Sequence, residues 1–524
     1  MRETLHGPGT VSLAKIPRHA VAMRPAIGPV STGSRRPVML GAPAAVGSGG
    51  VDGLLNDTLA PFAAWLSEMI FYEVSIGGVS FPLIVAWLIA GATYFTFYFR
   101  GINVRGMREA FALLRPSADE RDQPGEISHF QALATALSGT VGVGNIAHVA
   151  VAISIGGPGA IFWLVVAGFL GMASKFVECT LGVKYRVQNP DGSVSGGPMF
   201  YLHRGLAELG WPRLGRGLAI YYAVCISIGC LGVGSMFQSN QAYVQFLGVT
   251  GGDASFVADR GWTFGLVLAV LVGAVTIGGI KSIARVAGKL VPFMALLYAA
   301  AAMFVIAVNF QRIPEAVSLI LRGAFAPEGM VGGAVAVAVL GFRRAAFSNE
   351  AGIGSAAIAH SAVRTGEPIT QGLVALLEPF IDTVLICTMT GLVITLTVYE
   401  PGLGTGGISG VELTSSAFAG AISWFPYVLA IVVMLFAYST MIAWSYYGLE
   451  GCIYLFGPGR GTRVVFNLVF CASVALGAAT QLKAILDFSD ALVFAMALAN
   501  ILGLYMLAPV VRREYEHYRS RDKT

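Results

Sequence analysis

Apolar stretches recur along this chain from about residue 80 onwards, and only short polar segments separate them. A helix needs about 20 mainly apolar residues to span a lipid bilayer. A shorter amphipathic stretch, 312–325, predicts a helix that lies along the membrane interface. We predict eleven membrane-spanning helices, called helices one to eleven in this section, at residues 80–99, 128–152, 158–183, 216–248, 261–279, 287–309, 330–360, 370–398, 424–447, 463–480 and 488–511.

The composition agrees with a membrane protein. Hydrophobic residues make up 55% of the 524 positions, charged residues make up 12%, and the mean hydropathy is +0.71. Soluble domains are about 25% charged. The 66 glycines are typical of membrane helices whose backbones approach closely. We therefore expect an all-α polytopic membrane protein that contacts lipid, and the net charge of +5 predicts no nucleic-acid partner.

The distribution of lysine and arginine predicts the orientation. If the residues before helix one lie outside, the inner loops and the C-terminal end carry twenty-one basic residues and the outer loops carry four. Cytoplasmic loops of membrane proteins are enriched in these residues. The sequence therefore predicts a multi-pass protein of the plasma (inner) membrane with its N-terminus outside and its C-terminus in the cytoplasm.

Three regions follow from these patterns. Residues 1–55 are rich in proline, glycine and alanine and lack the apolar core of a signal peptide. We expect a disordered tail there. It could alternatively be a targeting segment, or the translation start could be assigned too early, with Met39 as the true start. Residues 56–511 form the transmembrane domain, and residues 512–524 form a basic cytoplasmic tail.

Helix two carries a polar stripe beside a cluster of glycines. Gln131, Ser138 and Asn145 are seven residues apart, so they share one helix face. In lipid such a stripe has to face protein or a water-filled cavity. Glycine at this density allows the helix to open, and an opened turn offers carbonyl groups to a cation and N–H groups to an anion. The alternative is close helix packing through glycine. The glycines are Gly139, Gly142 and Gly144.

Helix seven repeats this design. Its polar residues Ser348 and Asn349 are followed by glycines and by Ser355. A charge at membrane depth costs at least about 2.5–3.5 kcal/mol unless it is paired or hydrated. Glu350 lies seven residues after Arg343, so the spacing allows an ion pair along one helix face. We interpret the charged residues as a structural ion network or a gate, with a direct substrate or proton role for the carboxylate as the alternative. This charged group consists of Arg343, Arg344 and Glu350.

The two glycine-rich helices are five helices apart. Helices two to six and seven to eleven would each begin with a broken helix, and because five is odd the two units would have opposite topology. Discontinuous helices at matching positions of two halves are the best sequence pointer to a transporter site. The sequence therefore predicts a carrier, whereas a channel, an intramembrane enzyme or a sensor fits the pattern less well.

Four other helices carry polar residues at membrane depth. On helix four, Gln238 lies nearest a glycine-rich turn and is the better substrate candidate, with an interhelical hydrogen bond as the alternative. On helix eight, Asp382 lies four residues after Glu378, and we favour structural or gating roles for both. Lys175 and Glu178 on helix three predict a local ion pair. Helix nine carries two adjacent hydroxyls, which suit a small cation or else bond the preceding turn. These hydroxyls belong to Ser439 and Thr440.

Seven segments of the sequence together resemble the alanine or glycine:cation symporter (sodium:alanine symporter) family, and the resemblance extends from about residue 55 to 510. The resemblance rests on EISHFQALATALSGTVGVGNIA, GGPGAIFWLVVAGFLGMASKFVE, SGGPMFYL, GGIKSIARVAGKLVPFMALLY, AAFSNEAGIGSAAIAH, EPFIDTVLICTMTGLVI and FAYSTMIAWSYYGLE. It implies a leucine-transporter-like fold of about eleven helices, with an extra helix 80–99 before two inverted five-helix repeats, 128–309 and 330–511. It also implies uptake of alanine, glycine or a similar small neutral amino acid, coupled to sodium or less often to protons, with the sodium ion as coupling ion and no cofactor.

The resemblance also implies functional roles for individual residues. Ser439 and Thr440 would bind sodium together with the backbone near Gly139 and Gly142, and Asp382 joins the gating or structural group. The implied substrate-binding residues are Ser138, Gly139, Thr140, Gly142, Val143, Gly144, Asn145, Gln238, Ser348, Asn349, Gly352, Gly354 and Ser355.

The chain departs from the family pattern beside this pocket. Many members have threonine at the position of Val143 and glycine at the position of His148, and helix four reads GSMFQSN where GNMVQAN is expected. A hydroxyl lost at position 143 removes a contact worth about 0.5–1.5 kcal/mol. These departures affect the choice of substrate rather than the class of protein.

Overall fold

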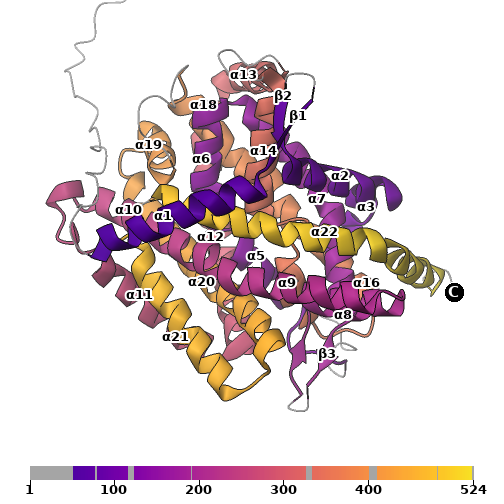
Figure 1. Ribbon diagram of the computed structural model, residues 1–524. Helices are drawn as coiled ribbons and strands as arrows, with labels where there is room; N and C mark the ends of the chain where they lie inside the picture. Colours follow the sequence, from indigo (N-terminus) through magenta and orange to yellow (C-terminus); the bar gives the residue numbers. More distant parts are fainter. Residues whose placement is uncertain are drawn as a thin grey trace, which may run out of the picture. The chain divides into compact units, whose positions relative to one another are not determined.

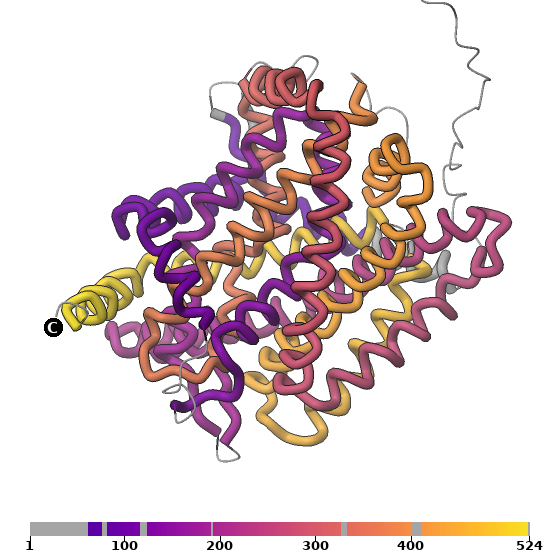
Figure 2. Tube along the Cα trace, turned by 180° about the vertical axis from the view of Figure 1, so that it is seen from behind, coloured from indigo at the N-terminus to yellow at the C-terminus, as the bar shows by residue number. Residues whose placement is uncertain are grey.

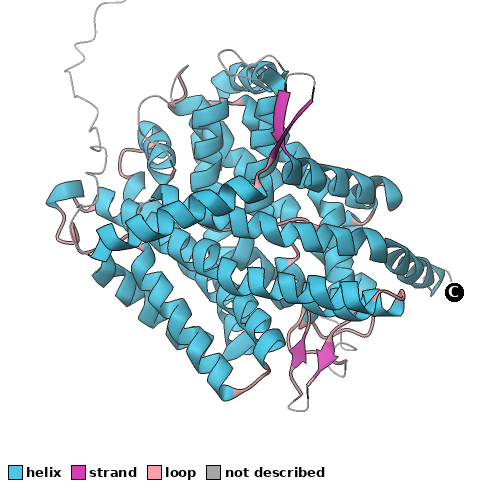
Figure 3. Cartoon of the chain, viewed as in Figure 1, coloured by secondary structure: helices cyan, strands magenta, loops and turns pink. Residues whose placement is uncertain are grey.

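The predicted apolar stretches coincide with helices in the computed structural model, which describes residues 51–76, 79–115, 123–189, 192–325, 333–400, 410–480 and 482–521. Helices form nearly all of this part of the chain, and its only strands form two short antiparallel hairpins (Figure 3). The elements up to the first loop are α1 (Val51–Ile70), β1 (Glu73–Ile76), β2 (Val79–Pro82), α2 (Leu83–Tyr98), α3 (Ile102–Arg105) and α4 (Met107–Ala112).

The region predicted as the first repeat begins with a broken helix and includes the second hairpin. Its elements are α5 (His129–Thr140), α6 (Gly144–Gly156), α7 (Gly159–Lys184), β3 (Val187–Gln188), β4 (Val194–Ser195), α8 (Pro198–Glu208), α9 (Pro212–Leu231), the π-helix η2 (Gly232–Met236), α10 (Phe237–Val249), η3 (Gly252–Ala254), α11 (Gly261–Thr276) and α12 (Gly279–Val308). Figure 2 shows α12 from behind, leading towards α13 at one end of the bundle.

The region predicted as the second repeat also begins with a broken helix. The elements from the connecting segment onwards are η4 (Phe310–Arg312), α13 (Ile313–Phe325), α14 (Gly333–Asn349), α15 (Ser355–Ser361), α16 (Pro368–Ala375), α17 (Leu377–Pro379), the π-helix η5 (Phe380–Cys387), α18 (Thr388–Thr397), α19 (Val411–Ala421), α20 (Phe425–Phe456), α21 (Arg460–Gly477) and α22 (Leu482–Arg521).

Seven helical segments of the described residues are long and apolar enough to cross a membrane, and the bent pair of α2 with α3–α4 would add an eighth. The predicted count of eleven stays a prediction, because α11 is a shorter apolar helix and α14–α15 is interrupted. The two hairpins lie at opposite ends of the helices, with β1–β2 near α13 (Figure 1).

Helix α1 is an element that the sequence analysis missed, because its polar residues and Pro61 interrupt the apolar pattern. It packs along α22 (Figure 1), and Phe71, the residue after α1, contacts Phe494 with ring centroids 5.0 Å apart. The predicted boundary after residue 55 falls inside this helix. The rest of the predicted tail, residues 1–50, lies outside the described residues.

The predicted boundary at residue 511 also falls inside a helix. Helix α22 continues to Arg521, because ion pairs hold its last turns against other parts of the chain. Glu514 pairs with Lys184 at 2.6 Å, and Arg519 pairs with Glu109 at 2.8 Å. The predicted basic tail is therefore helical over residues 512–521.

The region 312–325 contains the predicted helix, α13, whereas its position along the membrane interface stays a prediction. Helix α13 docks closely on the start of α7. The indole of Trp163 donates a hydrogen bond to the Ala324 carbonyl at 3.0 Å. A β-carbon added at Gly159 would lie 2.0 Å from the carbonyl carbon of Gly323. Glycine at 159 is therefore required for this contact.

We expect Gly159→Ala to destabilise the protein by about 1–3 kcal/mol, because the added methyl group forces α13 away from α7. Gly217→Ala is the matched control: a β-carbon there meets no atom within 4 Å, so alanine should be neutral or slightly stabilising in α9. Thermal unfolding of both purified variants in detergent measures the difference, and equal melting temperatures would contradict the proposed contact.

Candidate functional site

Helix two is broken, as its glycines predict. Helix α5 ends at Thr140 and α6 begins at Gly144, and Val141 between them has a non-helical ψ of 87°. The Gly142 N–H donates to the side-chain oxygen of Asn145 at 2.9 Å. This side chain satisfies one of the backbone donors that the break releases, in the manner of a helix cap.

Helix seven is broken in the same way. Helix α14 ends at Asn349, and α15 begins at Ser355. Three residues of the intervening turn have positive φ angles, namely Glu350 at 55°, Gly352 at 86° and Gly354 at 92°. The two glycines adopt this left-handed backbone without strain. A positive φ is uncommon for a residue such as Glu350. Its carboxylate is held by hydrogen bonds from Ser355 and Trp444.

Asp382 on η5 connects the two breaks. Its Oδ1 accepts from the Asn145 amide at 2.6 Å, and its Oδ2 accepts from the hydroxyls of Ser348 at 2.8 Å and Thr383 at 2.6 Å. The predicted site residues Asn145, from helix two, and Ser348, from helix seven, thus meet on one carboxylate. Asn349 donates to the Thr383 hydroxyl at 2.9 Å and extends the same network. Asp382 is fully buried.

The two hydroxyls predicted for sodium lie on α20 against the first break. Ser138 donates to the backbone carbonyl of Ser439 at 2.6 Å, which ties α5 to α20. A β-carbon at Gly142 would lie 2.4 Å from the Thr440 hydroxyl oxygen, so only glycine fits there. Among the described residues this hydroxyl has no hydrogen-bond partner, although it is buried. The Ser439 hydroxyl donates to the Phe436 carbonyl at 2.9 Å and keeps acceptor lone pairs.

Gln238, the second residue of α10 and close after the π-helix η2, approaches the same break. Its amide nitrogen donates to the Val233 carbonyl at 3.1 Å. Its amide oxygen has no partner in the described part of the chain and lies 3.6 Å from the β-carbon position of Gly142. Helix α10 comes this close because Gly234 abuts Trp444, where a β-carbon would lie 2.3 Å from that of the tryptophan. Single-turn π-helices of this kind are frequent at functional sites.

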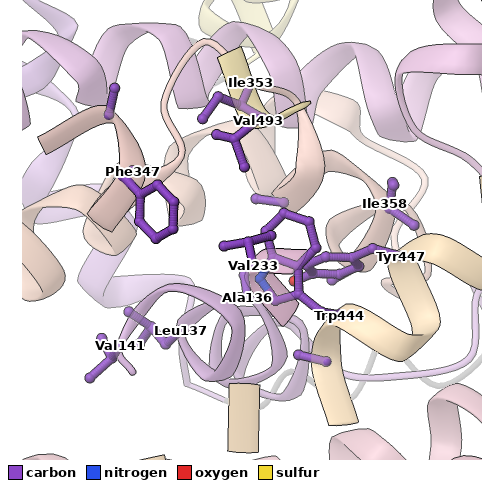
Figure 4. Packing of buried hydrophobic residues seen from close by; sticks show 14 of the residues in the cluster. Ala136, Leu137, Val141, Val233, Phe347, Ile353, Ile358, Trp444, Tyr447 and Val493 are labelled. Carbon is purple, nitrogen blue, oxygen red and sulfur yellow. The ribbon is translucent and has the colours of Figure 1, made fainter. Parts of the chain in front are cut away.

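Trp444 is a site residue that the sequence analysis missed. Its indole N–H lies 3.3 Å from the Gly139 carbonyl and 3.2 Å from the Glu350 carboxylate, so it contacts both broken helices. It lies four residues after Thr440, on the same face of α20, and this spacing is the signal that identifies it. Figure 4 shows Trp444 and Tyr447 among apolar side chains from α5, α14, α15 and α22 around the breaks.

The remaining predicted residues of helix two are buried at or next to the break. The Thr140 hydroxyl bonds the Ala136 carbonyl at 3.3 Å within its own helix. Gly139 lies against Tyr447, whose hydroxyl would be 3.1 Å from an added β-carbon. Val143 and Gly144 are buried at the start of α6.

The predicted residues on the far side of the second break contact the surrounding helices. β-Carbons at Gly352 and Gly354 would meet Leu88 of α2 and Pro198 of α8. The Ser355 hydroxyl donates to the second oxygen of Glu350. These residues shape the turn, whereas Ser348 lies on the side that faces Asn145.

The charges of helix seven pair differently from the prediction. Arg343 bonds Asp490 of α22 at 2.7 Å, Arg344 lies 3.4 Å from the same carboxylate, and Glu350 bonds Trp444 and Ser355 instead. The positive φ of Glu350 turns its side chain off the face of α14, so the spacing of seven does not apply.

The predicted ion pair between Lys175 and Glu178 is also wrong. Lys175 pairs with Glu378 at 2.9 Å, and Glu178 accepts from Asn500 at 2.8 Å. The local pair does not form because both carboxylates bond a donor on another helix, Glu378 the amine of Lys175 and Glu178 the amide of Asn500.

One arginine connects the loops that flank the two broken helices. Arg186, after α7, donates to the carbonyl of Pro124 before α5, to that of Ser361 at the end of α15, and to those of Val363 and Thr365 beyond it. Burial lowers the pKa of its guanidinium to about 10, so it stays charged at neutral pH. The start of α5 and the end of α15 are thereby held together in this structure.

Comparisons with known proteins agree with this geometry. The chain matches the model of the sodium:alanine symporter family over residues 66–524. It is 37% identical over 443 residues to the sodium/alanine symporter AgcS of Methanococcus maripaludis, which covers 84% of this chain and 95% of the relative. It is 33% identical over 443 residues to the probable sodium/glutamine symporter GlnT of Bacillus subtilis, with 84% and 88% covered.

The solved structure of MhsT in complex with L-phenylalanine has a similar fold, with a TM-score of 0.50 at 14% identity, and the match covers 74% of this chain and 98% of that chain. This likeness agrees with a leucine-transporter-like arrangement, whereas the five-plus-five inverted repeat stays a prediction. The apolar helices and the family together identify an integral membrane transporter rather than an enzyme. The chain belongs to the sodium:alanine symporter family.

Proposed function

We propose that the protein carries small neutral amino acids, alanine and glycine first, into the cell together with sodium by alternating access. The observation that carries this proposal is the convergence at the first break of two buried oxygen atoms that lack partners among the described residues, those of Thr440 and Gln238. Buried polar atoms are nearly always bonded. Two free acceptors beside an opened helix therefore support a site for charged solutes.

Sodium and the substrate occupy neighbouring parts of this site. Hydroxyl and carbonyl oxygens suit a small hard cation, so the hydroxyls of Ser439 and Thr440 and the carbonyls at the end of α5 bind sodium. The substrate carboxylate lies at the start of α6, where the helix dipole and the N–H groups near Gly144 favour an anion. Gln238 faces the substrate through its free oxygen.

The coupling ion provides the energy for accumulation. One charge that crosses about 150 mV releases about 3.5 kcal/mol, and a tenfold sodium gradient adds about 1.4 kcal/mol. Together these support roughly thousandfold accumulation. Coupling requires that the sodium-loaded and sodium-free states differ in substrate affinity. Because sodium and the carboxylate contact the same break, each stabilises the geometry that the other needs.

The orientation follows from the basic loops, with the N-terminus outside and the C-terminus in the cytoplasm of a plasma (inner) membrane. The hairpins β1–β2 and β3–β4 lie at opposite ends of the helices, as this orientation requires (Figure 3). The group of Arg343, Arg344 and Asp490 then lies in the outer half of the protein and acts as a gate.

Two alternatives share the fold. A proton-coupled amino-acid carrier would use Glu350 or Asp382 in place of sodium. A transporter-like sensor would bind the amino acid without moving it. No observation favours either over sodium coupling.

Uptake by proteoliposomes tests the proposal. We expect labelled alanine or glycine to accumulate above equilibrium under an inward sodium gradient and not in choline. Gln238→Ala should reduce uptake by about tenfold or more, because it removes a polar contact from a site that excludes water. Binding without uptake would favour a sensor, and uptake driven by protons in choline would move the coupling site to the carboxylates.

Thr440→Val should raise the sodium concentration that gives half-maximal uptake by about tenfold or more, since a contact with a charged partner contributes about 1.5–3 kcal/mol. Thr440→Ser keeps the hydroxyl and should behave nearly like the original protein. Sodium titrations of alanine uptake compare the two variants. An equal sodium requirement in both would remove Thr440 from the sodium site.

Asp490→Asn should lower the maximal uptake rate more than it lowers substrate affinity, because two partly or fully buried arginines lose their countercharge. Asp487→Asn is the matched control on the same helix, since Asp487 pairs with the exposed Lys483 at 2.6 Å and forms no ion pair with either arginine among the described residues. Initial rates over a range of alanine concentrations separate the two effects. Similar rates in both variants would contradict a gating role.

A further inference from the structure

His148 lies on α6, one turn beyond the first break, at a position that the proposed transport mechanism does not use. Its ring packs between two aromatic rings, with centroids 4.6 Å from Phe237 and 4.0 Å from Phe347. Its Nδ1 is 3.8 Å from the β-carbon position of Gly144. Gly144 is the first residue of α6, where the proposed substrate carboxylate lies, so the imidazole is next to that part of the proposed site.

Both ring nitrogens of His148 lack a hydrogen-bond partner among the described residues, and the residue is 1% exposed. A buried polar atom without a partner is costly, and the few that occur in native proteins call for an explanation such as a ligand. Two free nitrogens beside an opened helix make His148 a candidate substrate contact.

The protonation state of His148 follows from the charges around it. Arg343 and Arg344 on α14 and Asp490 on α22 are the charged groups that influence the ring. Asp490 is bonded to the arginines, and within the described ranges no carboxylate lies within ion-pair distance of the imidazole. A buried ring in this setting is neutral, so it offers one N–H donor and one acceptor.

We propose that His148 is a specificity-determining residue, whose imidazole bonds the hydroxyl of a small substrate side chain and makes serine a preferred substrate. A hydroxyl is both donor and acceptor, and so it complements a neutral imidazole. The ring also fills the space between Phe237 and Phe347, which limits the side chain to a short one. The inference rests on the proposed amino-acid transport.

The test compares serine with 2-aminobutyrate, which has the same size but a methyl group in place of the hydroxyl. Each competes with labelled alanine for sodium-driven uptake in proteoliposomes. We expect the original protein to prefer serine by about two- to tenfold, the range of one hydrogen bond. His148→Phe keeps a ring between its two neighbours and should abolish or reverse this preference, whereas His148→Gln, with a donor and an acceptor, should restore part of it.

His203→Phe is the matched control, because it makes the same change in α8, where the histidine bonds Tyr454. Its preference for serine should equal that of the original protein. An original protein without a serine preference, or a His148→Phe variant that keeps it, overturns the inference. The first of these results needs no variant, so the test stands even if His148→Phe fails to fold. Absent sodium-driven alanine uptake would instead overturn the proposed function.

Discussion

Within a bilayer, every N–H and C=O group that a helix break releases has to find a partner inside the protein. Polar side chains supply these partners at both breaks, and they come from several helices. This constraint explains why asparagine and tryptophan gather where the backbone opens. The contacts are Asn145 to the Gly142 N–H, Asn349 to the Ala351 N–H, Trp444 to the Gly139 carbonyl and Asn500 to the Gly352 carbonyl.

A second consequence is that the two breaks depend on each other. Asp382 accepts hydrogen bonds from Asn145 and Ser348, and Trp444 contacts Gly139 and Glu350. A movement of either half-helix therefore changes contacts of the other. Such shared contacts provide a physical route by which an ion at one break alters the affinity for a solute beside it.

The helices around the breaks are held by a buried polar chain. Gln371 of α16 bonds both His129, at the start of α5, and His360 of α15. His360 faces Glu378, whose other oxygen accepts from Lys175 at 2.9 Å. Removal of one partner from a buried pair leaves an uncompensated charge and costs about 3–5 kcal/mol. These buried polar contacts therefore hold the surrounding helices as a rigid frame. For the site to open at either end, specific contacts of the broken helices with this frame have to separate.

The sequence by itself determined what local periodicity and composition specify. Apolar length identified most of the helices, and glycine density located both breaks. The predicted common face of Ser138 and Asn145 does not hold, because the helix is interrupted between them: Ser138 bonds Ser439 of α20, whereas Asn145 bonds Asp382 of η5. The sequence did not identify the partners of charged residues, because a carboxylate bonds whichever donor the fold brings near. Arg343 with Asp490 and Lys175 with Glu378 are joined across helices far apart in the chain, and so is Trp444 with both breaks. Only tertiary packing decides such contacts, because no local pattern records which helices become neighbours.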